Sequence, residues 1–287
     1  MVGSGVAHAR RLVSPASWLL ATVSLAVGCG TPDAPVAAPA RTTAVLALQP
    51  YFRELKTVRV SAAGLPLTML FDTGGGATLI APDVASKIGC APFGRDVGHR
   101  MTGEAVEFQR CESLILTSGG WQRRLEPVAV FDIGRLLPPE LPRLDGVLAL
   151  DAFDGDVVTL DWPAGTVTVH AAADAAAALT RTGVPVRIAT GDNGRFYSAL
   201  LPVAASRGGL WFLLDSGNTR GTLVAQHVTR DGRLNVRENG DAALTIGARP
   251  PVSLRIEPAD LDIDGALGTA WLQLGPVTLD LRTVPNR

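Results

Sequence analysis

Two short stretches of the chain place a carboxylate at the end of an apolar run and follow it with glycine. The first is "MLFDTGGG", around Asp72, and the second is "FLLDSGN", around Asp215. A carboxylate at the end of a buried strand is costly unless another group uses it. Two carboxylates held about 3 Å apart cannot both ionise, so such a pair shares one proton. One carboxyl can then take a proton from water while the other protonates a carbonyl oxygen, which is the chemistry of peptide hydrolysis.

The sequence around these two stretches repeats in one order. Each aspartate follows a glycine-containing turn and an apolar strand, and each is followed by Thr-Leu. A repeat this long predicts two similar lobes and not a solenoid, which uses shorter periods and more copies. The later landmarks that repeat are "RLEPVAVFDI" (124–133) with "RIEPADLDI" (255–263), "LDGVLALDAF" (144–153) with "IDGALGTAWL" (263–272), and "VVTLDWPAGTVTV" with "PVTLDLRTV".

These motifs resemble the signature of the aspartic peptidases. In that family, an apolar strand ending in Asp-Thr-Gly or Asp-Ser-Gly is followed later by a short apolar segment with glycine, here Gly146-Val147-Leu148 and Gly265-Ala266-Leu267. From roughly residue 46 to 287, the chain resembles a bacterial retropepsin-like enzyme fused into a two-lobed, pepsin-like single chain. The resemblance implies an all-β acid-protease fold, with pseudo-twofold-related, barrel-like lobes and few short helices.

The resemblance also implies roles for the residues of the two motifs. Asp72 and Asp215 would form the catalytic dyad that grips the attacking water. Glycines after them would let the two loops approach closely, and hydroxyls beside them would cross-link the loops. The supporting residues implied in this way are Thr73, Gly74, Ser216 and Gly217.

The implied activity is that of an aspartic endopeptidase acting on extended peptides or proteins, with no cofactor. The alternative is a catalytically inactive module of the same fold, which would serve in binding or assembly in the cell envelope. Because loss of activity in such folds usually removes a dyad aspartate, the presence of both favours the enzyme. The duplicated chain is expected to be a monomer with an internal pseudo-dimer.

The first lobe has room for a flap over the substrate. From Asp72 to Asp145 there are 73 positions (145 − 72), whereas from Asp215 to Asp264 there are 49 (264 − 215). The surplus contains "DVGHRMTGEAVEF", which predicts two strands around a turn. The expected substrate-covering residues are Met101, Thr102 and Gly103. The tyrosine of the pepsin flap is absent, and a plain surface hairpin is the alternative.

The residues after each motif differ from those of many pepsins. Those enzymes have Ser or Thr at the positions that Gly75 and Asn218 occupy here. Gly75 has no side chain that could donate a hydrogen bond to an ionised carboxylate. The sequence therefore predicts a pH optimum in the weakly acidic to neutral range.

Most segments that must position these residues read as strands. With 31 Gly and 20 Pro, the composition favours short strands and turns. "TVRVSAAGLPLTMLF" predicts a hairpin turning at Ala63-Gly64, and "APDVASKIG" predicts a short helix with Pro82 in its first turn and Gly89 at its end. An alanine-rich helical turn at 170–183 would join an amino-terminal lobe (45–178) to a carboxy-terminal lobe (179–287).

The amino terminus resembles a bacterial lipoprotein signal. Two arginines precede the apolar run "WLLATVSLAVGC", which is too short to span a bilayer. The expected parts are a signal peptide (1–28), a lipidated Cys29 and a Pro/Ala-rich tether (29–44). An ordinary signal peptide with a chance cysteine is the alternative. Because Gly30 replaces the aspartate that retains lipoproteins in the inner membrane, we expect a periplasmic-side anchor in the outer membrane.

The other two cysteines, Cys90 and Cys111, form an even pair in an oxidising compartment. A disulfide between them and two free buried thiols are the two interpretations.

The sequence lacks the residues that a nucleic-acid, phosphate, calcium or other metal site would need. The formal net charge of −1 gives no basic field for nucleic acid. "DTGGGATL" has no Lys-Ser/Thr for phosphate, and "DLDIDG" (260–265) opens like a calcium loop but has Trp271 at the twelfth position. "DAFDGD" (151–156) is interpreted as a solvated turn. The histidines show no metal-ligand spacing, so no metal site is predicted: His8, His99, His170 and His227.

Overall fold

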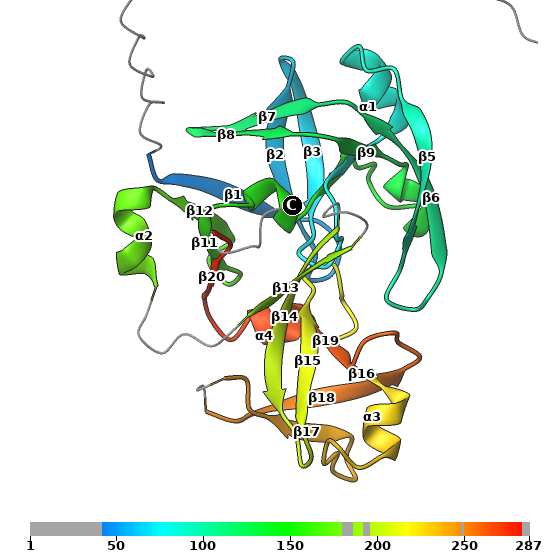
Figure 1. Ribbon diagram of the computed structural model, residues 1–287, viewed down its shortest axis with the longest axis vertical. Helices are drawn as coiled ribbons and strands as arrows, with labels where there is room; N and C mark the ends of the chain where they lie inside the picture. The colour runs from blue at the N-terminus through cyan, green and yellow to red at the C-terminus, as the bar shows by residue number, and fades with distance from the viewer. Residues whose placement is uncertain (1–41, 180–185, 192–195, 248–249, 283–287) are drawn as a thin grey trace, which may run out of the picture. The chain divides into compact units, whose positions relative to one another are not determined.

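The computed structural model describes residues 42–179, 186–191, 196–247 and 250–282 (Figure 1). The expected signal peptide (1–28), Cys29 and most of the tether lie outside these residues, and the first strand already begins at Ala44. Within the described ranges, no helix is both long enough and apolar enough to cross a membrane.

The described chain is mostly β, as predicted, and its strands form two mixed sheets. The first sheet contains β1 (Ala44–Pro50), β2 (Lys56–Ala62), β3 (Leu65–Phe71), β4 (Leu79–Ile80), β5 (Phe93–His99), β6 (Ala105–Cys111), β7 (Leu114–Ser118), β8 (Trp121–Leu125), β9 (Val128–Val130), β10 (Gly146–Leu148), β11 (Val157–Asp161), β12 (Thr166–His170) and β20 (Val277–Asp280). The second sheet contains β13 (Arg187–Gly191), β14 (Phe196–Ala204), β15 (Gly209–Leu214), β16 (Thr222–Ala225), β17 (Asp241–Leu244), β18 (Val252–Ala259) and β19 (Gly265–Leu267).

Helices are short, and two of them confirm sequence predictions. α1 begins with Pro82 in its first turn, and Gly89 follows it with φ +75°. α2 lies in the alanine-rich segment expected to join the lobes. The helical elements of the described residues are α1 (Pro82–Lys87), α2 (Ala172–Ala178), α3 (Gln226–Arg230), α4 (Thr269–Leu272), η1 (Ile133–Leu136) and η2 (Leu150–Phe153).

The repeat seen in the sequence is a repeat of topology. Neighbouring strands run β2-β3-β10-β4-β9-β6 in the first sheet and β14-β15-β19-β16-β18-β17 in the second. In each run the third strand is parallel to the one before it and antiparallel to the one after it. The fourth and fifth strands are parallel in both. Two copies of one β unit therefore confirm the predicted two-lobed architecture.

The hairpin formed by β2 and β3 turns where the sequence indicates. Ala63 and Gly64 both have positive φ, at 48° and 79°, which suits a two-residue turn between right-twisted strands. Its second strand, β3, leads directly to Asp72.

The strand that carries Asp72 lies on a packed aromatic core. Phe71 is 1% exposed, and its ring lies 6.2 Å from that of Phe153 and 6.4 Å from that of Trp162. Phe212 and Leu214 are fully buried in the equivalent strand, β15. Burial on this scale fixes the strand ends from which the two aspartates project.

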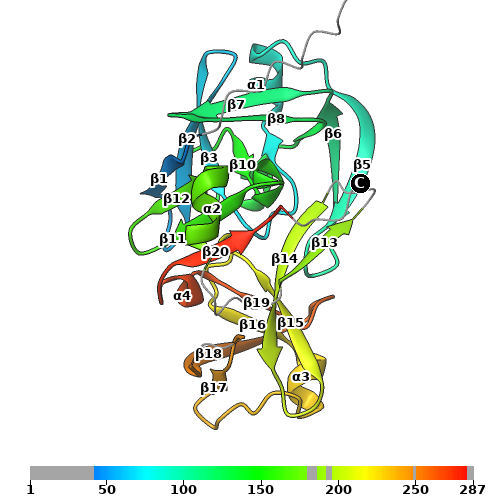
Figure 2. The same cartoon turned by 60° about the vertical axis from the view of Figure 1, so that its left-hand side comes forward.

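The last strand of the described residues, β20, pairs with β11 in the first sheet (Figure 2). β11 and β20 are the equivalent "VTLD" segments of the repeat, and Thr159 lies opposite its own counterpart, Thr278. Their hydroxyl oxygens are 2.8 Å apart. Equivalent residues meet in this way only near a local twofold axis, as expected for a pseudo-dimeric chain.

The β5–β6 hairpin contains the residues predicted for the flap. His99 pairs with Ala105, so the intervening turn presents Met101, Thr102 and Gly103 at its tip. The base of the same hairpin is closed by a disulfide between Cys90 and Cys111, whose Cα atoms are 5.9 Å apart. The disulfide is thereby confirmed, and the alternative of two free thiols is wrong.

Removal of this disulfide should destabilise the protein. The bond closes a loop with a sequence separation of 21, which in the chain-entropy description contributes about 3 kcal/mol. The C90A/C111A double variant should therefore unfold at lower denaturant concentration than wild type. Reductant should lower the midpoint of wild type and leave that of the variant unchanged. A wild-type midpoint that does not respond to reductant would contradict this expectation.

Candidate active site

Each predicted catalytic aspartate follows the end of an equivalent strand. The N–H of Asp72 donates to the carbonyl of Leu148 at 3.1 Å, and the N–H of Asp215 donates to the carbonyl of Leu267 at 3.0 Å. These carbonyls belong to β10 and β19, the short strands that run parallel to β3 and β15. The second signature segments thus hold the aspartates in place.

The two loops are cross-linked by the hydroxyls expected to do so. Thr73 Oγ1 donates to the carbonyl of Leu214 (2.8 Å) and accepts from the N–H of Ser216 (2.9 Å). Reciprocally, Ser216 Oγ donates to the carbonyl of Phe71 (3.0 Å) and accepts from the N–H of Thr73 (2.9 Å). Both side chains are fully buried. Four bonds therefore join the halves of the chain beside the aspartates.

This cross-link brings the carboxyl groups of Asp72 and Asp215 close together, each against the glycine of the opposite loop. The N–H of Gly74 donates to Asp72 Oδ1 at 2.9 Å, and the N–H of Gly217 donates to Asp215 Oδ1 at 3.0 Å. Asp215 is 3% exposed, whereas Asp72 is partly accessible. Backbone donors thus orient both carboxyls, and Asp72 is the more accessible of the two.

The glycines are required by the contact between the loops. A Cβ on Gly74 would lie 2.4 Å from Asp215 Oδ1, and a Cβ on Gly217 would lie 2.5 Å from Asp72 Oδ2. Both distances are far below van der Waals contact, and any larger residue would push the carboxyls apart. This explains in steric terms why the third residue of both motifs is glycine.

The environment of the pair raises both pKa values. Burial raises the pKa of Asp72, although N–H groups of Gly74, Gly217 and Gly75 oppose the rise. Burial, and then the negative charge of Asp72, raises the pKa of Asp215 well above its ordinary value. A proton is therefore retained by the pair under conditions in which an isolated carboxyl would have lost it.

The positions after each motif act as the sequence indicates. A Cβ on Gly75 would lie 3.2 Å from Asp72 Oδ2, so a side chain there would touch the carboxylate. Asn218 uses its side chain within its own loop: Nδ2 donates to Gly221 and Oδ1 accepts from Arg220. Neither position supplies a side-chain donor to the dyad.

One support of the first loop was missed in the sequence. The N–H and hydroxyl of buried Thr78 both donate to the carboxylate of Asp151, at 2.9 Å and 2.5 Å. Asp156 is 8% exposed and its carboxylate lies 2.6 Å from the guanidinium of Arg123. The interpretation of 151–156 as a solvated turn is therefore wrong for these two residues. The signal available in the sequence was that Asp151 stands where the second copy of the repeat has Ala270.

The tip of the β5–β6 hairpin reaches the second half of the chain. The N–H of Asp262 donates to the carbonyl of Met101 at 3.0 Å, and a Cβ on Gly103 would lie 3.3 Å from the Asp262 carboxylate. The hairpin tip therefore contacts the second half of the chain, and its role as a flap stays a prediction. Asp262 was not singled out in the sequence, because nothing local indicates which loop the hairpin would touch.

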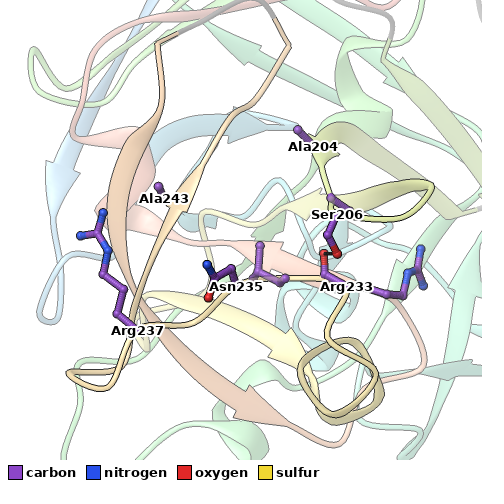
Figure 3. A pocket seen from close by; sticks show the side chains of 8 residues that line it. Ala204, Ser206, Arg233, Asn235, Arg237 and Ala243 are labelled. Atoms are coloured by element: carbon purple, nitrogen blue, oxygen red, sulfur yellow. Dashed lines mark hydrogen bonds between the residues drawn. The ribbon is translucent and has the colours of Figure 1, made fainter.

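Among the described residues, no group of three His, Cys, Asp or Glu side chains gathers as a metal site. A cavity of about 290 Å³ lies in the second half of the chain, and both arginine side chains at its rim extend away from it (Figure 3). Its lining contains no residue of the dyad loops: Ala204, Ala205, Ser206, Arg233, Leu234, Asn235, Arg237 and Ala243.

Comparisons with known proteins do not assign the chain to a family. No family model matches the sequence, and no curated protein matches it. Among solved structures, the chain is similar to the crystal structure of basic 7S globulin from soybean, with a TM-score of 0.49 and 12% identity. The alignment covers 84% of this chain and 92% of that chain.

The raised pKa of Asp215 makes a prediction about stability. A carboxyl whose pKa is raised by folding stabilises the protein only while it stays protonated, so stability falls as pH rises from the ordinary value of 3.8 through the raised value. Asp215→Asn removes this dependence, since an amide cannot ionise. The variant should be more stable than wild type at neutral pH, by about 1.4 kcal/mol for each unit of elevation.

Thermal unfolding from pH 4 to 8 measures this difference. The stability advantage of Asp215→Asn should shrink as the pH falls. Asp231→Asn, which changes an exposed carboxylate, should match wild type throughout. A variant that is less stable than wild type at neutral pH, by a margin independent of pH, would count against the buried pair.

Proposed function

We propose that this chain is an aspartic endopeptidase of the two-lobed, pepsin-like kind, which hydrolyses extended polypeptides with water activated between Asp72 and Asp215. The observation that carries the proposal is the mutual contact of two carboxyls on equivalent, cross-linked loops. A protein that needed these loops only for folding would not require two costly carboxyls in contact at their centre.

The surroundings of the two carboxyls favour different roles for them. Asp72 receives N–H donors from both loops and is the more exposed, which favours its ionised form. Asp215 is buried and its pKa is raised further, which favours its protonated form. The water oxygen then attacks the carbonyl carbon of the peptide while Asp72 takes a proton from that water. Asp215 gives its proton to the carbonyl oxygen of the peptide.

Collapse of the resulting gem-diol completes the reaction. One hydroxyl proton returns to Asp215, the C–N bond breaks, and the leaving nitrogen takes the proton held by Asp72. The products are a carboxylic acid and an amine, and the dyad regains its starting protonation. No covalent intermediate forms, so substrate positioning must come from binding along the peptide.

The β5–β6 hairpin is proposed as the flap that covers the peptide. Its tip residues Met101, Thr102 and Gly103 are joined to the second half of the chain through the Met101–Asp262 hydrogen bond. That bond must open for an extended chain to enter, and the disulfide at the base keeps the hairpin paired while it moves.

The amino-terminal features support a proposed location. Lipidation of Cys29 would anchor the enzyme on the periplasmic side of the outer membrane, with the Pro/Ala tether separating the enzyme from the bilayer. Its partners would then be envelope peptides or proteins. The disulfide is consistent with an oxidising compartment.

Purified protein from Cys29 onward should cleave a mixed peptide library. Asp72→Asn or Asp215→Asn should each lower kcat/KM by at least about 10³-fold, because either change removes the acid–base pair. A pepstatin-like inhibitor should block the wild-type reaction. Cleavage that survives both substitutions would place the chemistry elsewhere, and wild-type protein that cleaves at no pH would favour the inactive binding module.

The position of Gly75 makes a prediction about pH. Because a Cβ there would lie 3.2 Å from Asp72 Oδ2, the hydroxyl of Gly75→Ser can donate to the ionised carboxylate and lower its pKa. The acidic limb of the pH–rate profile should move to lower pH. Gly75→Ala adds the same Cβ without the hydroxyl and should leave the limb in place. Equal shifts in both variants would show that bulk, and not hydrogen bonding, sets the profile.

A further inference from the structure

Two aspartates that the proposed reaction does not use occupy equivalent places in the repeat. Asp145 immediately precedes β10, and Asp264 immediately precedes β19. Each is followed by glycine and an apolar pair, so the sequence repeats them as well. Neither contacts the dyad through any hydrogen bond found in the described chain.

Asp145 is bonded to the strand that carries Asp72. Its Oδ2 accepts the N–H of Thr68 at 2.7 Å, and its own N–H donates to the carbonyl of Thr68 at 2.9 Å. Thr68 lies on β3, four residues before Asp72. The backbone and the side chain of Asp145 are therefore both hydrogen-bonded to the same residue of that strand.

Asp264 repeats the side-chain contact in the second half. Its Oδ2 accepts the N–H of Trp211 at 2.9 Å, and Trp211 lies on β15, four residues before Asp215. The other oxygen, Oδ1, faces His227 Nε2 at 3.8 Å and the guanidinium of Arg233 at 3.6 Å. Its charge is thus balanced by Arg233, in the loop that follows α3.

Each carboxylate closes one end of a short parallel ladder. β10 pairs with Met69–Phe71 and β19 with Phe212–Leu214, three residues in each case. The opposite end of each ladder is closed by the N–H of the dyad aspartate itself. A three-residue parallel ladder is weak by itself. Because a hydrogen bond to a charged carboxylate is stronger than one between neutral groups, each carboxylate strengthens its ladder.

We propose that Asp145 and Asp264 are positioning residues for the dyad, which fix the register of β3 and β15 and thereby the separation of Asp72 and Asp215. The inference rests on the proposed function and deepens it. Neither residue touches substrate or the reacting atoms, and each acts through four residues of strand. A displacement of about 1 Å at a reacting group can cost on the order of 10²-fold in rate.

The test compares Asp145→Ala and Asp264→Ala with a matched control. Asp161→Ala also removes a carboxylate that accepts a backbone N–H, from Ala164 at 3.0 Å, but that N–H lies in the turn after β11 and not on β3 or β15. With active sites titrated by a tight inhibitor, kcat of the first two variants should fall roughly 10- to 100-fold with KM changed by less than about threefold. Asp161→Ala should keep wild-type kcat.

The conservative variants separate positioning from folding. Asn keeps an oxygen that accepts the same N–H, so Asp145→Asn and Asp264→Asn should retain most of kcat. Glu keeps the charge but moves the acceptor by one methylene, so Asp145→Glu and Asp264→Glu should lose rate even if the Ala variants do not fold. Folded Ala or Glu variants with wild-type kcat per titrated site would overturn the proposal, whatever their melting temperatures.

A second readout needs no substrate. ¹³C-carboxyl NMR measures the two apparent pKa values of the dyad. If the Ala variants lose the register of β3 or β15, the two carboxyls should interact less strongly and their apparent pKa values should move closer together. In the Asn variants the two values should stay apart. Wild-type protein that cleaves no peptide would refute the proposed function alone. An unchanged pKa separation in the Ala variants would refute the positioning role alone.

Discussion

The close approach of two carboxyls, one buried and one partly accessible, across a local twofold axis is the constraint on which the rest of the structure depends. Asp72 and Asp215 would repel one another if both were ionised, so the fold must hold them together while a proton neutralises one of them. The reciprocal bonds of Thr73 and Ser216 supply that restraint, because each hydroxyl both donates to and accepts from the backbone of the opposite half of the chain. The cost of the contact explains both the glycines beside it and the density of hydrogen bonds around it.

Symmetry explains how one chain builds this contact. The same strand unit occurs twice, and equivalent residues meet at two separate places, the dyad loops and the Thr159–Thr278 pair of β11 and β20. The two halves are nevertheless not identical in their supports. Asp151 holds the first dyad loop from outside, whereas Asn218 holds the second loop from within. Differences of this kind let two copies of one motif have different electrostatic environments, which an acid–base pair requires.

Much of the site could be predicted from the sequence because its residues carry local signals. An aspartate at the end of an apolar strand, followed within two residues by glycine and present twice, predicts the candidate dyad. Ala63-Gly64 and Pro82 predict a turn and a helix that the structure confirms. Asp262 and Asp151 could not be found in this way, because their roles depend on which distant segment each one meets. The pairing of Cys90 with Cys111 also stayed open until the hairpin brought the two together. The sequence therefore predicts which residues form the candidate site, and tertiary contacts decide which segments support them.

Neutron diffraction from deuterated crystals grown at weakly acidic pH tests the central claim most directly. The account predicts a single deuteron between the facing carboxyl oxygens of Asp72 and Asp215, with the backbone N–H groups of Gly74 and Gly217 directed at the pair. Two unprotonated carboxylates separated by ordered solvent, with the threonine and serine hydroxyls turned away from the opposite loops, would contradict it.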